Sequence, residues 1–122
     1  MTGQKKMPFI DVRPWGWFEQ FTLNQKTTVK IISVARGEMT SSQSHEKRSE
    51  FWRVLRGEFD ITIGNTIHRA YRGDRFEVPV GAIHRIVGIG EDNELLEISS
   101  GEFDENDIIR YEDKYARTND NS

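Results

Sequence analysis

The chain has 122 residues, of which 30% are charged and 35% hydrophobic, and this size allows one compact domain. Its formal net charge of −3 argues against nucleic acid or an anionic membrane as the main partner, because both require a basic surface. The absence of cysteine excludes disulfide scaffolds, thiolate metal sites and cysteine nucleophiles. The chain has no signal-peptide pattern and no apolar run of about 18 residues, so we expect a cytoplasmic protein.

Apolar residues mostly alternate with polar ones, a pattern that predicts strands with one face toward a core. The clearest alternation, Phe59 to Ile63, continues past Gly64-Asn65 into residues 66–71 and predicts a β-hairpin. We predict further strands over residues 15–22, 27–35, 50–56, 76–78, 84–87 and 94–99. Glycines separate these segments, which is typical of an all-β sandwich or barrel.

One domain is predicted over residues 13–117, with residues 1–12 as an N-terminal extension and the polar residues 118–122 as a frayed tail. Trp15 and Trp17 are expected in the core or at a dimer interface, because aromatic side chains dominate burial in small barrels. Exposed edge strands and abundant aromatic residues together favour a homodimer.

Two of the three histidines lie within ordered glycine frameworks. The first framework runs Gly37, five residues, Gln43-Ser44-His45, four residues, Glu50, six residues, Gly57, and the second runs Gly73, five residues, Pro79-Val80-Gly81, two residues, His84. The third histidine, His68, has no such framework and is expected to be an ordinary strand residue.

Residues two apart on a strand point to the same face, so Gln43 and His45 are expected to project together into the barrel. Glu50 would enter the interior beside Trp52 and Val54, where a buried carboxylate needs a partner. Together with His84, these residues form a set of two nitrogen and two oxygen ligands that suits Zn, Fe, Mn or Co and leaves a position for water or substrate.

The two frameworks resemble the two motifs of the cupin superfamily, with Gln43 standing where many cupins carry a first histidine. The resemblance implies a double-stranded β-helix, or jelly-roll, barrel. A cupin without a metal, in which these residues are structural, is the alternative reading of the same motifs.

A narrower resemblance is to type II mannose-6-phosphate isomerases. Arg13-Pro14-Trp15-Gly16 resembles the opening of that family, and residues 101–115 are similar to its closing segment, an acidic run followed by Ile-Val-Arg and Glu-Asp-x-Tyr. Matches continue between these ends, through Gln43-x-His45-x-x-Arg48-Ser49-Glu50-x-Trp52 and Pro79-x-Gly81-x-x-His84-Arg85. In many relatives the domain follows a mannose-1-phosphate guanylyltransferase, whereas here we expect a stand-alone domain.

This resemblance implies interconversion of mannose 6-phosphate and fructose 6-phosphate through an enediol or enediolate. The divalent cation would stabilise the oxyanion at O1 and O2 of the sugar, and Glu50 could act as the base if its metal bond is loose. Arg48 and Arg85 are the first candidates to bind the phosphate, followed by Arg13 and Arg110.

The chain departs from the isomerase pattern at several positions, and among these Glu46, Lys47 and Phe51 stand where that family usually carries further histidines. Metal binding is therefore better supported than the specific reaction. Two alternatives stay open, a non-catalytic cupin that binds a sugar or small anion, and a metal oxygenase.

Overall fold

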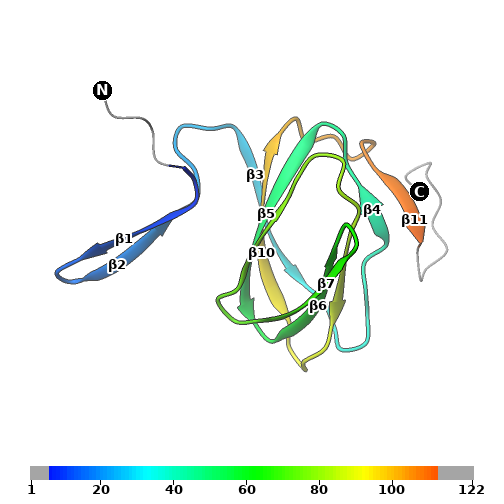
Figure 1. Ribbon diagram of the computed structural model, residues 1–122, viewed down its shortest axis with the longest axis horizontal. Coiled ribbons are helices and arrows are strands. Elements are labelled where there is room, and N and C mark those ends of the chain that lie inside the picture. The colour runs from blue at the N-terminus through cyan, green and yellow to red at the C-terminus, as the bar shows by residue number, and fades with distance from the viewer. Residues whose placement is uncertain (1–5, 113–122) are drawn as a thin grey trace.

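The computed structural model describes residues 6–112, which form strands and no helix (Figure 1). The strands are β1 (Phe9–Arg13), β2 (Gly16–Gln20), β3 (Thr27–Ser33), β4 (Ser42–Ser44), β5 (Arg48–Arg56), β6 (Glu58–Ile63), β7 (Thr66–Tyr71), β8 (Arg75–Val78), β9 (His84–Gly88), β10 (Glu94–Gly101) and β11 (Ile109–Glu112). Within this part of the chain, no helix has the length and apolarity needed to cross a membrane. The all-β prediction is confirmed.

Two antiparallel sheets enclose the core, and a separate hairpin lies beside them. One sheet has the order β3-β10-β5-β8 and the other the order β11-β4-β9-β6-β7. The pair β1-β2 forms the hairpin, which projects from one side of the two sheets (Figure 1). The predicted turn at Gly64-Asn65 is confirmed, because β6 and β7 pair from Ile63 and Thr66 outward.

Alternate residues of β5 point inward, as the two-residue repeat of a strand requires. Arg48, Glu50, Trp52 and Val54 are all buried, whereas the residues between them are at most partly buried. The interior is polar where β5 begins and apolar farther along the strand. The apolar core consists of Val34, Trp52, Val54, Phe59, Ile61, Ala70, Val78, Ile86 and Leu95.

Both chain ends differ from the expected strand list. Residues 9–13, which straddle the predicted start of the domain, form β1 and pair with β2. Residues 109–112 form β11, which adds to the edge of β4. The predicted tail at 118–122 lies outside the described residues.

Asn93 ties three segments together at the apolar end of the barrel. Its side chain donates to the carbonyls of Val34 and Gly90 and accepts from the Glu58 amide, at distances of 2.8–3.0 Å. Gly57 packs directly on this network and has φ +83°, so a Cβ there would lie 2.8 Å from the Asn93 Cα. The framework glycine at 57 is therefore required by close approach as well as by its backbone conformation.

We expect Gly57→Ala to destabilise the fold by at least about 2 kcal/mol more than Gly73→Ala. Both alanines are strained by a positive φ, but only the Cβ at position 57 also clashes with backbone atoms. Gly73 is a matched control, with φ +94° and nothing within 4 Å of an added Cβ. Chemical denaturation of the two variants measures the difference. Equal losses of stability would contradict the packing role assigned to Gly57.

Candidate metal centre

Three strands bring two imidazoles and one carboxylate together inside the barrel. His45 directly follows β4, Glu50 lies on β5 and His84 begins β9, and one ligand atom from each lies within 4.8 Å of the other two. His45 Nε2 is 3.5 Å from Glu50 Oε2, and His84 Nε2 is 3.8 Å from Glu50 Oε1. All three residues are buried. Such a group could hold a metal ion.

Backbone carbonyls fix the orientation of both imidazoles. His45 Nδ1 lies 2.7 Å from the carbonyl oxygen of Asp107, and His84 Nδ1 lies 3.0 Å from that of Ala82. A carbonyl only accepts, so each Nδ1 carries the proton and each Nε2 presents its lone pair to the cluster. Histidine ligands of metals are held by the same kind of outer hydrogen bond.

Burial also keeps the two imidazoles neutral. It lowers the pKa of His45, an effect that the nearby Arg48 guanidinium reinforces. Burial likewise lowers the pKa of His84, against the opposing influence of the Glu50 carboxylate. Neutral imidazole is the form that binds a metal.

Glu50 is held from both sides. The indole nitrogen of Trp52 donates to its Oε1 at 3.1 Å, and Arg48 Nε donates to its Oε2 at 3.3 Å. Arg48 also lies 3.2 Å from His45 Nε2 through Nη2, where the imidazole accepts. The guanidinium thus supplies positive charge where a cation would bind, and a cation would displace it from His45 because like charges repel.

Two buried polar atoms beside Glu50 test whether a metal fits. Neither His84 Nε2 nor Ser99 Oγ has a hydrogen-bond partner among residues 6–112. Ser99 lies directly opposite Glu50 in the β10–β5 register, so both atoms flank the same carboxylate. Buried groups without partners are rare in proteins, and a cation with its bound water would satisfy both atoms. The residues present therefore fit a metal.

Gln43, the fourth ligand expected from the sequence, is a strand neighbour of the cluster. It is directly opposite His84 in the β4–β9 register, and its Oε1 accepts a hydrogen bond from Ser41 at 2.9 Å. Arg110 is its cross-strand neighbour on the other side, in β11. Directly opposite residues share a face of the sheet, so Gln43 and Arg110 face the interior with His84.

The other candidate arginines lie elsewhere. Arg85 alternates with His84 on β9 and donates to the carbonyls of Thr40 and Glu112, both at 3.0 Å. Arg13 lies on the β1–β2 hairpin and pairs with Asp11 at 3.1 Å. Of the four predicted phosphate-binding arginines, the structure brings Arg48 to the cluster, places Arg110 opposite Gln43, and does not bring Arg13 or Arg85 to the cluster.

The positions that depart from the isomerase pattern do not face the cluster. Glu46 and Lys47 are exposed in the turn between β4 and β5, where the Asp107 carboxylate accepts from both of their amides. Phe51 lies on the outer face of β5, with its ring 5.6 Å from that of Phe21. The three substitutions therefore leave the interior ligand set unchanged.

A buried carboxyl that the sequence analysis did not single out also lies in the interior. Glu97 is opposite Trp52 in the β10–β5 register and is 7% exposed. Burial raises the pKa of Glu97 to about 7, an effect that the adjacent Glu50 carboxylate reinforces. The alternation of Leu95, Glu97 and Ser99 in the sequence was the available signal, because it places a carboxyl among inward-facing residues.

The loop between β10 and β11 covers the polar end of the barrel. The Asp107 carbonyl accepts from His45, and the Asp104 carbonyl accepts from Arg48 at 3.2 Å. Phe103 stacks under the Arg48 guanidinium, which lies 4.4 Å from its ring centroid. Backbone atoms of this loop thus orient a ligand histidine, and the residue types in the sequence do not encode such contacts.

We expect His84→Ala to lose the bound metal, because the substitution removes one of three converging donors. Elemental analysis after loading with Zn²⁺ and dialysis should give about one ion per chain for the unchanged protein and a small fraction of that for the variant. His68→Ala is the matched control, since His68 packs on Phe76 with ring centroids 5.3 Å apart, away from the cluster. A folded His84→Ala protein that retains the full metal content would contradict the site.

We expect Glu97→Gln to gain stability over the unchanged protein as pH rises, both measured after removal of metal with a chelator. The folded pKa of Glu97 is about 7 against an ordinary 4.5, so its favourable contribution is complete below 4.5 and is lost progressively as pH rises toward 7. The melting temperature of Glu97→Gln relative to wild type should rise by roughly 10 °C between pH 4.5 and pH 8. A difference that is constant with pH would contradict a buried, protonated Glu97.

Comparison with known proteins gives the family. Residues 4–113 match the family described as "Mannose-6-phosphate isomerase C-terminal". The chain is 36% identical over 108 residues to the xanthan biosynthesis protein XanB of Xanthomonas campestris pv. campestris (strain B100), covering 87% of this chain and 23% of that protein. It is 34% identical over 107 residues to the mannose-1-phosphate guanylyltransferase ManC of Salmonella typhimurium, covering 86% and 22%. The chain thus spans less than a quarter of the length of these curated relatives.

Solved structures agree on the fold. The Cnp3 cupin domain of Schizosaccharomyces pombe superposes with a TM-score of 0.60 at 19% identity, covering 68% of this chain and 58% of that one. A putative sugar phosphate isomerase from Acidithiobacillus ferrooxidans gives a TM-score of 0.57 at 25% identity, covering 62% and 51%. The predicted cupin fold is confirmed, and the chain belongs to the family of mannose-6-phosphate isomerase C-terminal domains.

Proposed function

We propose that the chain is a metal-dependent sugar-phosphate isomerase that interconverts mannose 6-phosphate and fructose 6-phosphate. The observation that carries this proposal is the buried cluster in which His45 and His84 direct their Nε2 atoms toward the Glu50 carboxylate. The family and the structural likeness to a putative sugar phosphate isomerase support the same reaction. Gln43, opposite His84, is the proposed fourth ligand.

The reaction moves protons within the sugar and needs no oxidant. A base removes the proton from C2 of the open-chain aldose, the electron pair forms the C1–C2 double bond, and the C1 carbonyl oxygen takes up negative charge. Return of a proton to C1 and transfer of the O2 proton to O1 complete the ketose. A bound divalent cation would supply Lewis-acid stabilisation of the negative charge that develops on O1 and O2.

Two interior carboxyl groups can handle the protons. Glu50 is the base proposed from the sequence, although its contacts with Arg48 and Trp52 already engage both of its oxygens. Glu97 contacts Glu50 and holds its proton to near neutral pH. Because Glu97 faces the interior opposite Trp52 and contacts Glu50, we propose that it accepts or returns a proton there.

Arg48 and Arg110 are the proposed binding groups for the substrate phosphate. Arg48 lies in the cluster and Arg110 is the cross-strand neighbour of Gln43, and a guanidinium can donate two parallel hydrogen bonds to a phosphate. Arg48 would have to turn from His45 toward the phosphate, and this movement would free the His45 Nε2 lone pair. In this proposal, metal binding and phosphate binding favour the same position of Arg48.

We propose that the sugar reaches the cluster by movement of the loop between β10 and β11. His45, Glu50 and His84 are at most 5% exposed, and Phe103 with Arg48 lies over them. A loop that opens for the sugar and closes over it would exclude water from the enediolate. The short contacts of Asp104 and Asp107 carbonyls define the closed position.

We expect the protein loaded with Zn²⁺, Co²⁺, Mn²⁺ or Fe²⁺ to convert mannose 6-phosphate to fructose 6-phosphate in a coupled assay. Glu50→Gln and His84→Ala should lower kcat/KM by roughly 100-fold or more, because each removes a metal ligand. His68→Ala is the control, since it leaves the cluster intact. In D₂O, the product should carry deuterium at C1 if the transferred proton exchanges with solvent on a carboxyl group.

Absence of turnover with all four metals in a folded, metal-loaded protein would contradict the proposal.

The contacts of Arg48 favour a second candidate function, because its guanidinium already neutralises Glu50 without a metal. That candidate is a non-catalytic cupin that binds a sugar phosphate or a small anion. Binding of mannose 6-phosphate that is equally tight in chelator and in Glu50→Gln would support it over the isomerase.

A further inference from the structure

A polar hollow lies at the β3 edge of the sheet that carries Glu50. Its volume is about 690 Å³, and it is lined by Lys26, Thr27, Thr28, Gly101, Glu102 and Phe103. These residues belong to the start of β3, the end of β10 and the chain next to each. The hollow therefore lies where the sheet meets the loop that covers the metal centre.

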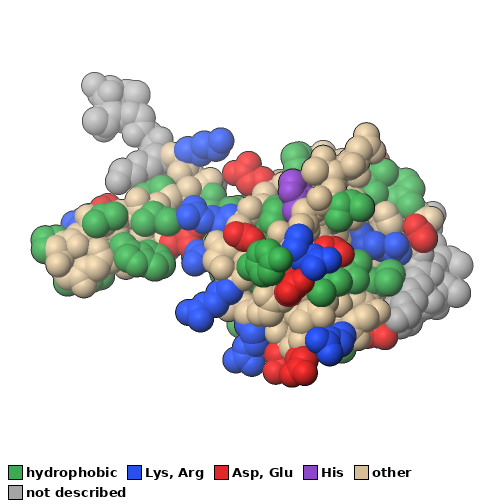
Figure 2. Space-filling model, turned by 60° about the horizontal axis from the view of Figure 1, so that its bottom comes forward, with side chains coloured by type: hydrophobic (Ala, Val, Ile, Leu, Met, Phe, Trp, Pro, Cys, Tyr) green, Lys and Arg blue, Asp and Glu red, His purple; other side chains and the backbone are tan. Residues whose placement is uncertain are grey.

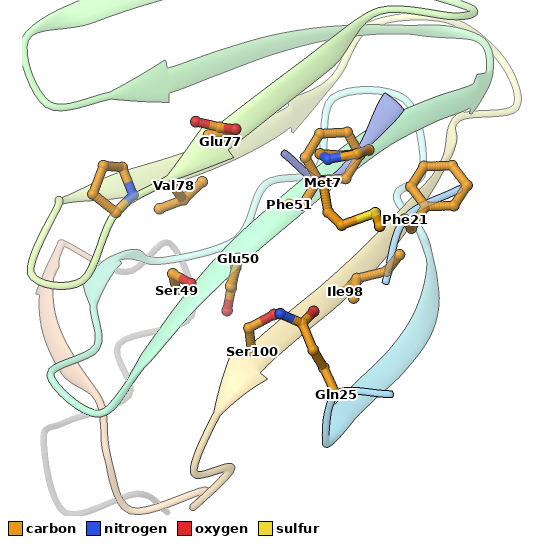
Figure 3. Close-up of a pocket in the computed structure, with 12 residues that line it drawn as sticks. Met7, Phe21, Gln25, Ser49, Glu50, Phe51, Glu77, Val78, Ile98 and Ser100 are labelled. Atoms are coloured by element: carbon orange, nitrogen blue, oxygen red, sulfur yellow. The ribbon is translucent and has the colours of Figure 1, made fainter. Parts of the chain in front are cut away.

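An interior row of paired residues leads from this hollow to the metal centre. Thr28 of β3 is directly opposite Ser99 of β10, and Ser99 is directly opposite Glu50 of β5. Directly opposite residues share a face, so Thr28 faces the interior with Glu50. Figure 3 shows Ile98 and Ser100, the neighbours of Ser99 on β10, beside a groove of about 380 Å³ on the outer face. Ser99 points the other way, and its buried hydroxyl has no partner among residues 6–112.

Lys30 stands in the next row of the same interior face. It is directly opposite Glu97, which is directly opposite Trp52, and both of these residues are buried. Lys30 itself is exposed, because β3 is the edge strand. Within the described part of the chain its ammonium makes no hydrogen bond or ion pair, and it lies 4.3 Å from the centroid of the Phe103 ring. Lys30 is thus a cation at the edge of the interior that is free to bind an anion.

Phe103 brings Lys30 close to Arg48, because both cations contact its ring. Lys30 Nζ and Arg48 Cζ lie 4.3 Å and 4.4 Å from the same ring centroid, so these two atoms are less than about 9 Å apart. A phosphate that accepts from an ammonium and a guanidinium at ordinary hydrogen-bond lengths would hold them about 7 to 8 Å apart. Charge-assisted hydrogen bonds are also stronger than the contact of an exposed cation with a ring. A phosphate therefore fits between the two cations once the ring moves aside.

The spacing between β3 and the metal centre fits an extended sugar phosphate. Strand β10 lies between β3 and β5, and adjacent strands are about 4.8 Å apart, so β3 is roughly 10 Å from β5. An open-chain hexose 6-phosphate spans about 8 Å from C2 to phosphorus, at bond lengths near 1.5 Å. A sugar with its O1 and O2 at Glu50 would therefore place its phosphate near Thr28 and Lys30.

Attraction of a phosphate depends on such local cations, because charges of both signs are mixed on the surface. The net charge of the chain is −3. On the face seen in Figure 2, Lys and Arg side chains are interspersed with Asp and Glu side chains. A mixed surface of this kind produces no broad positive field, so recognition of an anion depends on cations at the site itself.

We propose that Lys30 and Thr28 bind the substrate phosphate at the β3 edge of the interior and share it with Arg48. The inference rests on the proposed function, because it locates the phosphate of the same substrate. Lys30 would donate to the phosphate in place of its contact with Phe103, and the Thr28 hydroxyl would donate beside it. Lys30 is then a specificity-determining residue that selects a phosphorylated sugar over the free sugar, which lacks the group it binds.

Calorimetric titration of the Zn²⁺-loaded full chain with mannose 6-phosphate tests the proposal. We expect Lys30→Met, which keeps a long side chain beside Phe103 but removes the charge, to raise the Kd roughly tenfold or more. Lys30→Arg should restore the Kd to within about threefold of the unchanged protein, because it restores the charge. Arg56→Met is the matched control, since it removes one positive charge at the apolar end of the barrel, where Arg56 lies 3.9 Å from Glu94. Its Kd should stay within about twofold of the unchanged protein.

The outcomes separate this inference from the proposed function. A Lys30→Met protein that isomerises mannose 6-phosphate and binds it within about twofold of the unchanged affinity would overturn the inference alone. Weaker binding in Arg110→Met with unchanged binding in Lys30→Met would place the phosphate at β11 and would also overturn it. An unchanged protein that does not bind mannose 6-phosphate would overturn the proposed function together with the inference.

A second measurement uses the unchanged protein without metal and depends neither on variants nor on turnover. Inorganic phosphate, added in the presence of a chelator, should shift the backbone amide resonances of Lys30 and Phe103 in proton–nitrogen NMR spectra. These shifts should weaken as salt is added, because salt screens exposed charges. The amide of Ile67 is the internal control, since Ile67 is 69% exposed on β7 in the other sheet. Shifts at Lys30 and Phe103 that are no larger than the shift at Ile67 would overturn the inference.

Discussion

Burial of the Glu50 carboxylate is the constraint on which the polar half of this barrel depends. A carboxylate taken out of water costs several kcal/mol unless charge and hydrogen bonds compensate it. Trp52 and Arg48 donate to its two oxygens, and the two histidines turn their Nε2 atoms toward it. Acceptor atoms of Glu50, His45 and His84 therefore gather around one point. Arg48 compensates the charge of the Glu50 carboxylate only in part, and a divalent cation would complete that compensation.

The strand pattern of the fold was readable because its causes are local. Phe59 to Ile63 alternates with period two, and Gly64 supplies the positive φ that a tight hairpin needs. The ends were harder to predict. Strands β1 and β11 are short and mostly exposed, so their sequences lack the apolar alternation that a buried strand shows. Strand β11 pairs with β4, which is distant in the sequence, whereas β1 pairs with the next strand, β2.

Site residues that belong to the glycine frameworks were predictable from the sequence. Site residues whose position depends on the register between paired strands were not. His45, Glu50 and His84 converge as the glycine spacings suggested. Glu97 joins them only because β10 pairs with β5 in one particular register, over a sequence separation of more than forty residues. Arg85 follows His84 directly, yet adjacency on a strand sends the two side chains to opposite faces. That rule, applied to the sequence, would have ranked Arg48, two residues before Glu50, above Arg85.

The central claim is that the Nε2 atoms of His45 and His84 converge with Glu50 on one cation. Nitrogen-15 NMR of the imidazoles during titration with Zn²⁺ tests this claim most directly, because it reports each ring nitrogen separately. The account predicts that Nε2 of His45 and His84 shifts on metal binding while both Nδ1 atoms stay protonated and His68 is unaffected. Unchanged Nε2 resonances at saturating Zn²⁺, or coordination through Nδ1, would contradict it.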